Sequence, residues 1–100
     1  MDDTLDSLGR TVVDALSPAV TAYSIAHHEL TVSAQARDIV SVMRFLRDDP
    51  QCLFWNIIDV TAVDWPSRER RFDVVYHLLS PTKNRRIRVK IEAGEDTRIP

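Results

Sequence analysis

Residues 69–80 read ERRFDVVYHLLS, and this stretch is the strongest indication of the fold. Its second part, residues 72–79, is rich in β-branched and aromatic side chains, which are typical of strands. A charged entrance formed by Glu69, Arg70 and Arg71 precedes it. We therefore expect an inner strand of a sheet, entered through a charged loop.

A turn and a second strand follow this segment. Residues 81–84 contain a proline and an asparagine, which are typical of turns. Residues 86–92 then alternate strictly between charged and apolar side chains, so Ile87, Val89 and Ile91 are expected to point inward. Two strands joined by a short turn form a hairpin.

The segment before the charged loop is unusually apolar. Between Cys52 and Val63, large apolar side chains occur at both odd and even positions. A strand that is covered on both faces has this composition. We therefore expect a central strand here, with Trp55 and Trp65 as core or partial-core anchors. Trp65, beside Pro66 in a loop, is also a candidate interface residue.

Two amphipathic helices and two short strands account for the first half of the chain. Apolar spacings of three and four predict helices over about residues 4–16 and 34–48. Ser17-Pro18 ends the first helix, and Ser33 is the expected N-cap of the second. Two strands are expected around residues 27–29.

The order of these elements indicates an α+β fold. Two helices would pack on one face of a mostly antiparallel sheet of about four to five strands. A length of 100 residues fits one domain, residues 1–100, in which residues 94–100 form a flexible tail.

Composition excludes several classes of protein. The chain has 13 basic and 15 acidic residues, so its net charge of −2 gives no general reason to bind nucleic acid. The single cysteine, Cys52, cannot form an internal disulfide. No apolar run approaches the ~18 residues of a membrane-spanning helix, and the start lacks a signal peptide, so we expect a soluble intracellular protein.

The chain lacks a pattern of residues that would indicate catalysis or metal binding. Asp73 and His77 share a strand face but lie about 13 Å apart, too far for an acid–base pair. His27 and His28, as neighbours on a strand, would point to opposite faces. With one cysteine, neither zinc nor an iron–sulfur cluster is expected. We expect no catalytic, cofactor-binding or metal-ligating residue.

Two consecutive motifs resemble the respiratory complex I 30 kDa subunit family, the C subunit of NADH-quinone oxidoreductase. Residues 61–66 read TAVDWP and residues 68–80 read RERRFDVVYHLLS. In the family, a Leu-Thr-Ala-Val-Asp-Tyr segment leads through a charged loop into Arg-Phe-Asp-Val-Val-Tyr-His-Leu-Leu-Ser. The similarity covers about residues 23–93. A second family block, rich in tryptophan and containing Glu-Arg-Glu, has no counterpart here, so we expect the N-terminal domain of a longer subunit.

The resemblance implies a structural role. The domain would dock within the hydrophilic arm of a proton-pumping NADH:quinone oxidoreductase and support electron transfer from NADH to quinone without an active site. NADH, FMN, iron–sulfur clusters and quinone would bind to other subunits. Its partners would be subunits of this arm, chiefly the neighbouring quinone-site subunit, with no nucleic acid and no membrane insertion. In a bacterium it would be peripheral, on the cytoplasmic side of the inner membrane.

The candidate partner interface combines the charged loop with the basic strand. It consists of Trp65, Glu69, Arg70, Arg71, Arg86, Arg88 and Lys90.

Simpler explanations of the charged residues stay open. Glu69, Arg70 and Arg71 are equally typical of a solvated loop. The basic residues are also typical of a solvated sheet face or a protected edge strand.

Two alternative functions also stay open. The chain could belong to the related subunits of membrane-bound hydrogenases or of the chloroplast relative of complex I. It could instead be a stand-alone module that binds an anion or nucleic acid, although no aromatic residue interrupts the basic strand to stack on bases.

Overall fold

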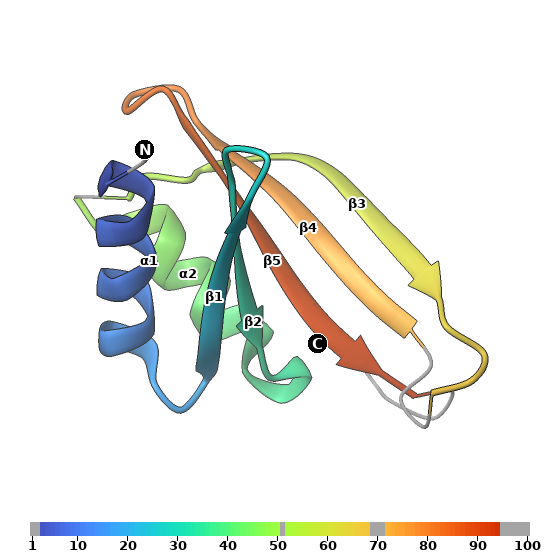
Figure 1. The fold of residues 1–100 in the computed structure, drawn as a ribbon. Coiled ribbons are helices and arrows are strands. Elements are labelled where there is room, and N and C mark those ends of the chain that lie inside the picture. Colours follow the sequence, from blue (N-terminus) through green and yellow to red (C-terminus); the bar gives the residue numbers. More distant parts are fainter. Residues whose placement is uncertain (1–2, 51, 69–71, 95–100) are drawn as a thin grey trace.

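β5 (Arg85–Ala93) is the central strand of a five-stranded sheet with the order β1-β2-β5-β4-β3. The computed structural model describes residues 3–50, 52–68 and 72–94. Figure 1 shows two helices beside the sheet, in agreement with the predicted α+β fold. In chain order, the other elements are α1 (Asp3–Leu16), β1 (Val20–Ala26), β2 (Glu29–Ala34), the short 3-10 helix η1 (Ala36–Asp38), α2 (Ile39–Asp48), β3 (Asn56–Asp64) and β4 (Phe72–Ser80).

The alternation along β5 builds the centre of the core. Ile87, Val89 and Ile91 are fully buried, as their spacing predicts. β5 pairs antiparallel with β4, and Tyr76 lies opposite Val89. It pairs parallel with β2 on its other side, which is the one parallel pair among the described strands. The predicted hairpin is therefore confirmed, and its turn contains Asn84 at a positive φ of 52°.

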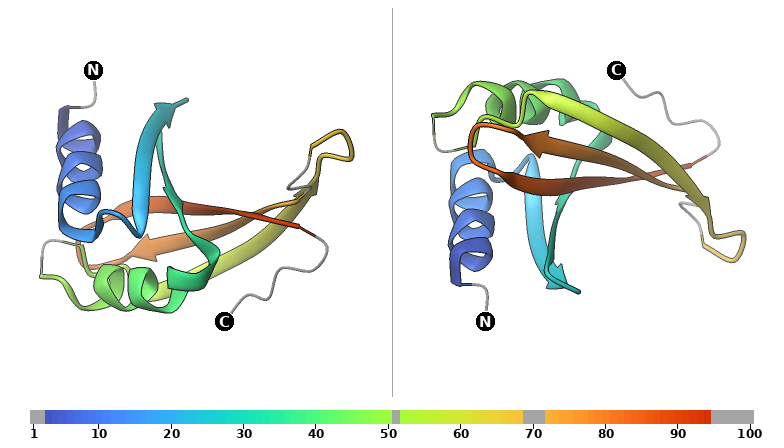
Figure 2. Two further views of the ribbon diagram at one scale, coloured as in Figure 1. Left: turned by 90° about the horizontal axis from the view of Figure 1, so that it is seen from below. Right: turned by 90° about the horizontal axis from the view of Figure 1, so that it is seen from above.

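Both helices contribute to a core on one face of this sheet. Leu8 and Val12 of α1 and Val42 and Leu46 of α2 belong to the same buried cluster as Ile87 of β5. The sheet is strongly twisted, so that α1 lies along β1 and β2 while α2 lies beneath the more distant strands (Figure 2). The helix bounds agree with the predicted ones to within a few residues, except at the start of α2.

The predicted N-cap of the second helix is wrong. Ser33 lies inside β2, opposite Ala22 of β1 and Lys90 of β5. Pairing on both sides keeps the backbone extended as far as Ala34. The chain then passes through the 3-10 turn of η1, and the α-helix begins at Ile39.

The two adjacent histidines form a turn and do not lie on a strand. His27 and His28 connect β1 to β2, with φ angles of 52° and 62°. Two consecutive residues with positive φ are the geometry of a tight turn whose twist matches that of the flanking strands. The expectation that strand alternation separates these two side chains is therefore incorrect, since alternation does not apply to a turn.

The largest difference from expectation concerns β3. It is an edge strand whose only neighbour among the described strands is β4, and its residues from Ile57 to Asp64 are all exposed. The predicted central strand with two covered faces is wrong. Cys52 and Phe54, just before β3, are buried in the core, but neither helix covers the apolar side chains of β3 itself. β4, in contrast, is an inner strand, as its composition predicts.

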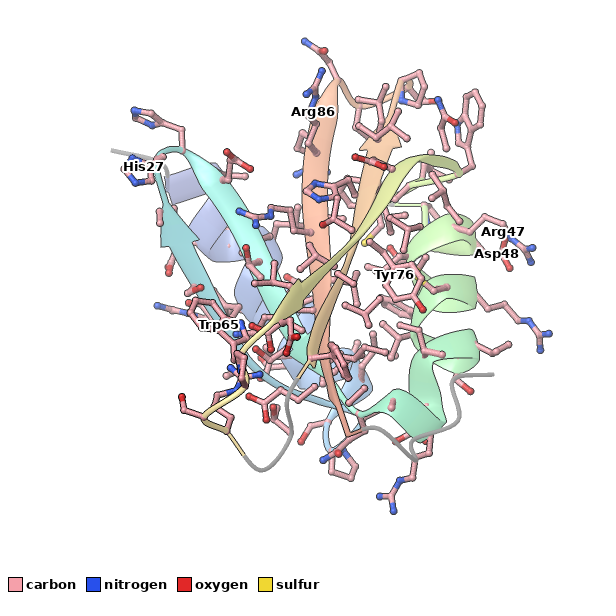
Figure 3. All side chains as sticks on the ribbon, turned by 90° about the vertical axis from the view of Figure 1, so that its right-hand side faces the viewer. His27, Arg47, Asp48, Trp65, Tyr76 and Arg86 are labelled. Carbon is pink, nitrogen blue, oxygen red and sulfur yellow. The ribbon has the colours of Figure 1, made fainter. Side chains whose placement is uncertain are left out.

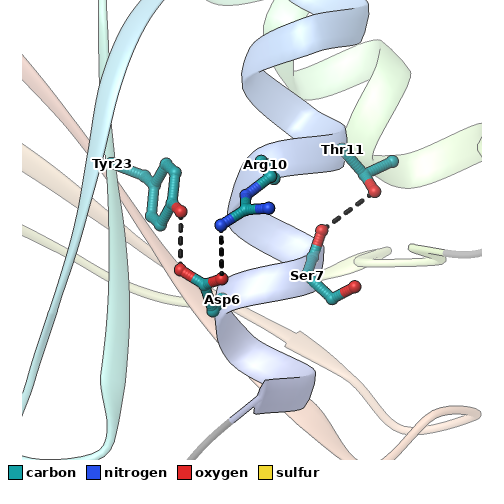
Figure 4. A network of polar contacts seen from close by, with 5 residues as sticks. All are labelled: Asp6, Ser7, Arg10, Thr11 and Tyr23. Carbon is teal, nitrogen blue, oxygen red and sulfur yellow. Dashed lines mark hydrogen bonds and ion pairs between the residues drawn. The ribbon is translucent and has the colours of Figure 1, made fainter.

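Polar contacts fix α1 against β1. The Tyr23 hydroxyl donates to Asp6 Oδ1 at 2.6 Å, and Arg10 Nη2 donates to Asp6 Oδ2 at 3.2 Å (Figure 4). One turn along the helix, buried Gly9 lies under the Tyr23 ring, and a Cβ placed there would be 2.5 Å from Tyr23 Cδ2. Position 9 therefore requires glycine, because the Tyr23 ring lies too close to the helix for any side chain there.

We expect Gly9→Ala to destabilise the protein, although alanine is a better helix former than glycine. The added methyl group would displace the Tyr23 ring and its hydrogen bond to Asp6, an overpacking cost of about 1–3 kcal/mol. Urea unfolding measures this change, with Ser7→Ala on the exposed face of α1 as the control. A Gly9→Ala protein as stable as the native chain would contradict the close contact.

Candidate docking surface

β3 exposes apolar side chains on the side of the sheet that carries the helices. The register places Val60 opposite Tyr76 and Ile57 opposite Leu78. Residues directly opposite each other in an antiparallel pair point to the same face. Tyr76 and Leu78 pack in the core beneath the helices, so Ile57 and Val60 face the same way. They are nevertheless 55% and 51% exposed, because no described element covers them.

A groove separates this strand from α2. Its volume is about 300 Å³. Val40, Met43, Arg44 and Arg47 of α2 line one side, and Phe54, Trp55, Ile57 and Leu78 line the other. Phe54 and Leu78 are buried, whereas Trp55 at the entrance is 56% exposed. Figure 3 shows Tyr76 between β3 and α2, with Arg47 and Asp48 pointing outward from the helix. The groove therefore has an apolar floor and arginines on the helix side.

A second exposed tryptophan follows the other end of β3. Trp65 is 47% exposed, but its indole Nε1 donates to Asp73 Oδ2 at 3.1 Å. Arg68 Nη2 donates to the second carboxylate oxygen of Asp73 at 2.7 Å, and its guanidinium lies 5.7 Å from the centre of the Trp65 ring. Alternation along β4 places Asp73 on the sheet face away from the helices. The loop thus holds Trp65 in one orientation on that face.

Asp73 is charged in the folded protein. Burial, the largest single influence, raises the pKa of this 8% exposed carboxyl, but the hydrogen bond and charge of Arg68, the charge of Lys90 and the Trp65 indole outweigh it. The net result is a pKa below the ordinary value of 3.8. Since both oxygens accept hydrogen bonds within the loop, Asp73 serves as its anchor.

The basic residues predicted as interface lie on the face away from the helices. Arg86, Arg88 and Lys90 alternate with the buried residues of β5, in the middle of the sheet. Arg88 Nη1 lies 3.6 Å from Glu29 Oε2 of β2. The edge-strand explanation of these charges is therefore incorrect, whereas a solvated sheet face agrees with their positions.

The other predicted interface residues divide into two groups. Trp65 is exposed, as an interface residue must be, although nothing in the structure shows its partner. Glu69, Arg70 and Arg71 lie outside the described residues, as do residues 95–100 of the expected tail.

A hollow at the β4–β5 turn is the part of the basic surface that agrees with the anion-binding alternative. Its volume is about 730 Å³, and Arg85, Arg86, Arg88 and His28 are among the residues that line it. The concentration of positive charge suits an anion in general and indicates no particular ligand.

The remaining reactive side chains have ordinary structural environments. His77 Nε2 lies 3.4 Å from Thr61 Oγ1 of the neighbouring strand. Cys52 is fully buried, and burial is the main cause that raises its pKa to about 11, so the thiol stays protonated at neutral pH.

Within residues 3–50, 52–68 and 72–94, no three His, Cys, Asp or Glu side chains are grouped so that they could hold a metal ion. The expectation that the chain binds no metal or cofactor stays a prediction.

Sequence reasoning did not identify the helix-side part of the surface. Trp55, Ile57, Val60 and Arg44 were outside the predicted interface. The sequence feature that could have identified it is the presence of apolar residues at both odd and even positions of β3. This pattern indicates burial by another chain as well as burial within the same sheet. None of the described helices is long and apolar enough to cross a lipid bilayer.

The Asp73 anchor leads to a prediction about pH. The folded pKa of Asp73 is lowered, so its stabilisation is present above the ordinary value of 3.8 and is lost as pH falls through the folded pKa. We expect Asp73→Asn to lower the free energy of unfolding at pH 7 by about 1.5–3 kcal/mol, because the amide offers one acceptor oxygen to two donors. The difference from the native chain should shrink below about pH 4.

Urea unfolding at pH 7 and pH 3 measures this difference, with the exposed Asp14→Asn as the matched control. A difference between Asp73→Asn and the native chain that is as large at pH 3 as at pH 7 would show that the carboxylate charge is not the stabilising feature. Trp65 fluorescence should shift toward that of a free indole in the Asp73→Asn protein only.

Comparisons with known proteins agree with the motifs of residues 61–80. A family described as "Respiratory-chain NADH dehydrogenase, 30 Kd subunit" matches residues 32–100. The C subunit of NADH-quinone oxidoreductase from Xanthobacter autotrophicus is 56% identical over 100 residues, covering all of this chain and 48% of that protein. The corresponding protein of Rhodopseudomonas palustris (strain TIE-1) is 54% identical over 101 residues, covering all of this chain and 50% of that protein. The chain thus spans about half the length of these relatives.

A solved structure shares the fold at much lower identity. A chain in the structure of the membrane-bound sulfane sulfur reductase, an archaeal respiratory membrane complex, superposes with a TM-score of 0.70. It is 20% identical, and the match covers 90% of this chain and 50% of that chain. The resemblance of the two motifs is confirmed by a family match over more than half of the sequence: the chain belongs to the respiratory-chain NADH dehydrogenase 30 kDa subunit family.

Proposed function

We propose that this chain is a non-catalytic docking domain of the 30 kDa subunit in the hydrophilic arm of a proton-pumping NADH:quinone oxidoreductase. The single observation that carries the proposal is the apolar, uncovered β3 with an exposed tryptophan at each end. Isolated soluble proteins rarely leave so many large apolar side chains in contact with water, whereas surfaces that bind other proteins do. Tryptophan is also enriched among the residues that dominate binding energy at interfaces.

The relatives support the choice of complex. Proteins about half identical over the whole chain are named as the C subunit of NADH-quinone oxidoreductase. This favours the proposal over a subunit of a membrane-bound hydrogenase and over a stand-alone module. The structural neighbour at 20% identity supports the fold but does not favour one complex over another.

The chemistry of the complex would then reside in other chains. Asp73 is held by Trp65 and Arg68, and Cys52 is buried and protonated, so neither is placed for catalysis. NADH, FMN, iron–sulfur clusters and quinone would bind to neighbouring subunits. The proposed partner is chiefly the subunit that forms the quinone site. The domain would sit at the membrane through this partner, on the cytoplasmic side in a bacterium.

A chimera tests the proposal. Residues 1–100 replace the matched part of the homologous subunit in Xanthobacter autotrophicus, in a strain without its own copy of the gene. We expect the chimera to co-purify with the complex and to restore NADH:quinone reductase activity of the membranes, because the chain is 56% identical to the part that it replaces. The purified 100-residue chain alone should not oxidise NADH.

Two controls complete the test. A strain that carries the homologous subunit without the matched part sets the background activity, and the native gene sets the maximum. A chimera that is stable in the cell but absent from the purified complex would contradict the proposal. NADH oxidation by the isolated chain would contradict its non-catalytic character.

A further inference from the structure

We propose that the helix-side face of β3 binds a third helix, which another protein chain supplies and which carries an acidic residue beside its apolar stripe. The inference rests on the proposed docking function and deepens it by naming the surface and the chemistry of the partner. Here "the β3 groove" means the groove lined by Val40, Met43, Arg44, Arg47, Phe54, Trp55, Ile57 and Leu78.

The dimensions of helices and strands leave room for one more helix. A helix with its side chains is about 10 Å wide, which equals about two strand spacings of ~4.8 Å. α1 packs on β1 and β2, and α2 adds its apolar side to the same core next to it. Two helices therefore cover about four of the five strands. β3, at the edge opposite α1, is the strand that remains (Figure 1).

The two faces of β3 differ in a way that favours coverage on the helix side. Ile57 and Val60 face the helix layer, whereas Asp59, Thr61 and Val63, opposite His77, Val75 and Asp73, face the other way. The helix-side face continues the layer of Tyr76 and Leu78, and this core-facing side of an antiparallel sheet is the side that the next layer normally covers. The β3 groove already provides a buried floor of Phe54 and Leu78 for an inserted side chain. An apolar stripe of a helix fits such a groove.

The charges at the rim indicate the polar part of the partner. Arg47 is occupied, since its Nε donates to Asp48 Oδ1 at 2.7 Å and its Nη2 to Asp48 Oδ2 at 2.9 Å. Arg44 is exposed, and the acidic residue one turn away, Asp48, is hydrogen-bonded to Arg47, which is the main cause of its lowered pKa, with the Arg44 charge as a smaller cause. A carboxylate on the incoming helix would meet Arg44 with complementary charge and set the register of the helix.

Two other occupants fit less well. An added strand would need the free edge of β3, but a bulge between Ile57 and Asp59 interrupts it, and the Val60 N–H already donates to Asp59 Oδ1 at 2.9 Å. Bulges and charged residues of this kind oppose pairing at an edge. A second copy of the chain in a two-fold dimer would bring two Arg44 side chains toward the same interface, where like charges oppose association.

Photo-crosslinking in the assembled chimera tests the inference. p-Benzoylphenylalanine replaces Val60 in one chimera and Thr61, on the opposite face of the same strand, in the matched control. After irradiation of the purified complex, mass spectrometry identifies the attached peptide. We expect Val60 to crosslink to a helical segment of another chain that contains Asp or Glu within one turn of the attachment point. Thr61 should not crosslink to that segment.

Substitutions give a second, independent readout. Val60→Asp should reduce the amount of chimera that co-purifies with the complex at least tenfold, and Thr61→Asp should not. Val60 is half exposed in the isolated chain, so both variants should fold, which circular dichroism and urea unfolding verify. Arg44→Glu should also reduce incorporation, compared with Arg37→Glu at an exposed position of η1.

Each other outcome counts against the inference. Attachment of Val60 to a strand, a loop, lipid, the chimera's own remaining part or a second copy would overturn the helix as occupant. An assembled complex without a Val60 crosslink, or with equal incorporation of Val60→Asp and Thr61→Asp, would overturn the surface while the proposed function stands. An unsubstituted chimera that fails to join the complex would overturn both.

Discussion

The fold depends on the alternation of Ile87, Val89 and Ile91 along β5. A shift of pairing by one residue would move all three to the solvent face and bring Arg86, Arg88 and Lys90 into the core. β5 pairs with β4 and β2, and both neighbours place their own apolar residues against the same helices. The hairpin partner is close in sequence, whereas β2 is distant, so the parallel pair holds the two halves of the chain together.

A sheet with this core has more strands than its helices cover, and the uncovered strand β3 is the proposed docking surface. Ile57 and Val60 are about half buried in the isolated chain, so full burial would add to each about half of the ~1.5–3 kcal/mol that burying an exposed side chain of this size contributes. The same exposed side chains therefore lower the solubility of the isolated domain, and their burial would contribute to the free energy of binding a partner. The bulge and Asp59 reduce the risk of edge-to-edge association without covering this apolar face.

The successes and failures of prediction from sequence have physical reasons. Strict alternation identified β5, and periods of three and four identified α1 and α2, because each pattern fits one geometry. The apolar residues of β3 predict burial but not which molecule provides it, so the strand was assigned to the centre. The turn at His27 and His28 contains neither glycine nor asparagine, so its sequence does not indicate a turn. The contacts of Asp73 with Trp65 and Arg68 arise only once β3 and β4 have paired.

The Asp73 anchor also changes how Trp65 can act. A free tryptophan on a loop loses side-chain freedom when it binds a partner, at a cost of about 0.5–1.5 kcal/mol. Here the hydrogen bond to Asp73 and the Arg68 guanidinium above the ring fix the orientation before any partner arrives. Trp65 lies on the sheet face away from the β3 groove, so a partner that held only the groove would leave it in water. In the proposed docking mode, the two tryptophans that flank β3 would engage partner segments on both sides of the same strand, so docking would be sensitive to the position of the strand as a whole.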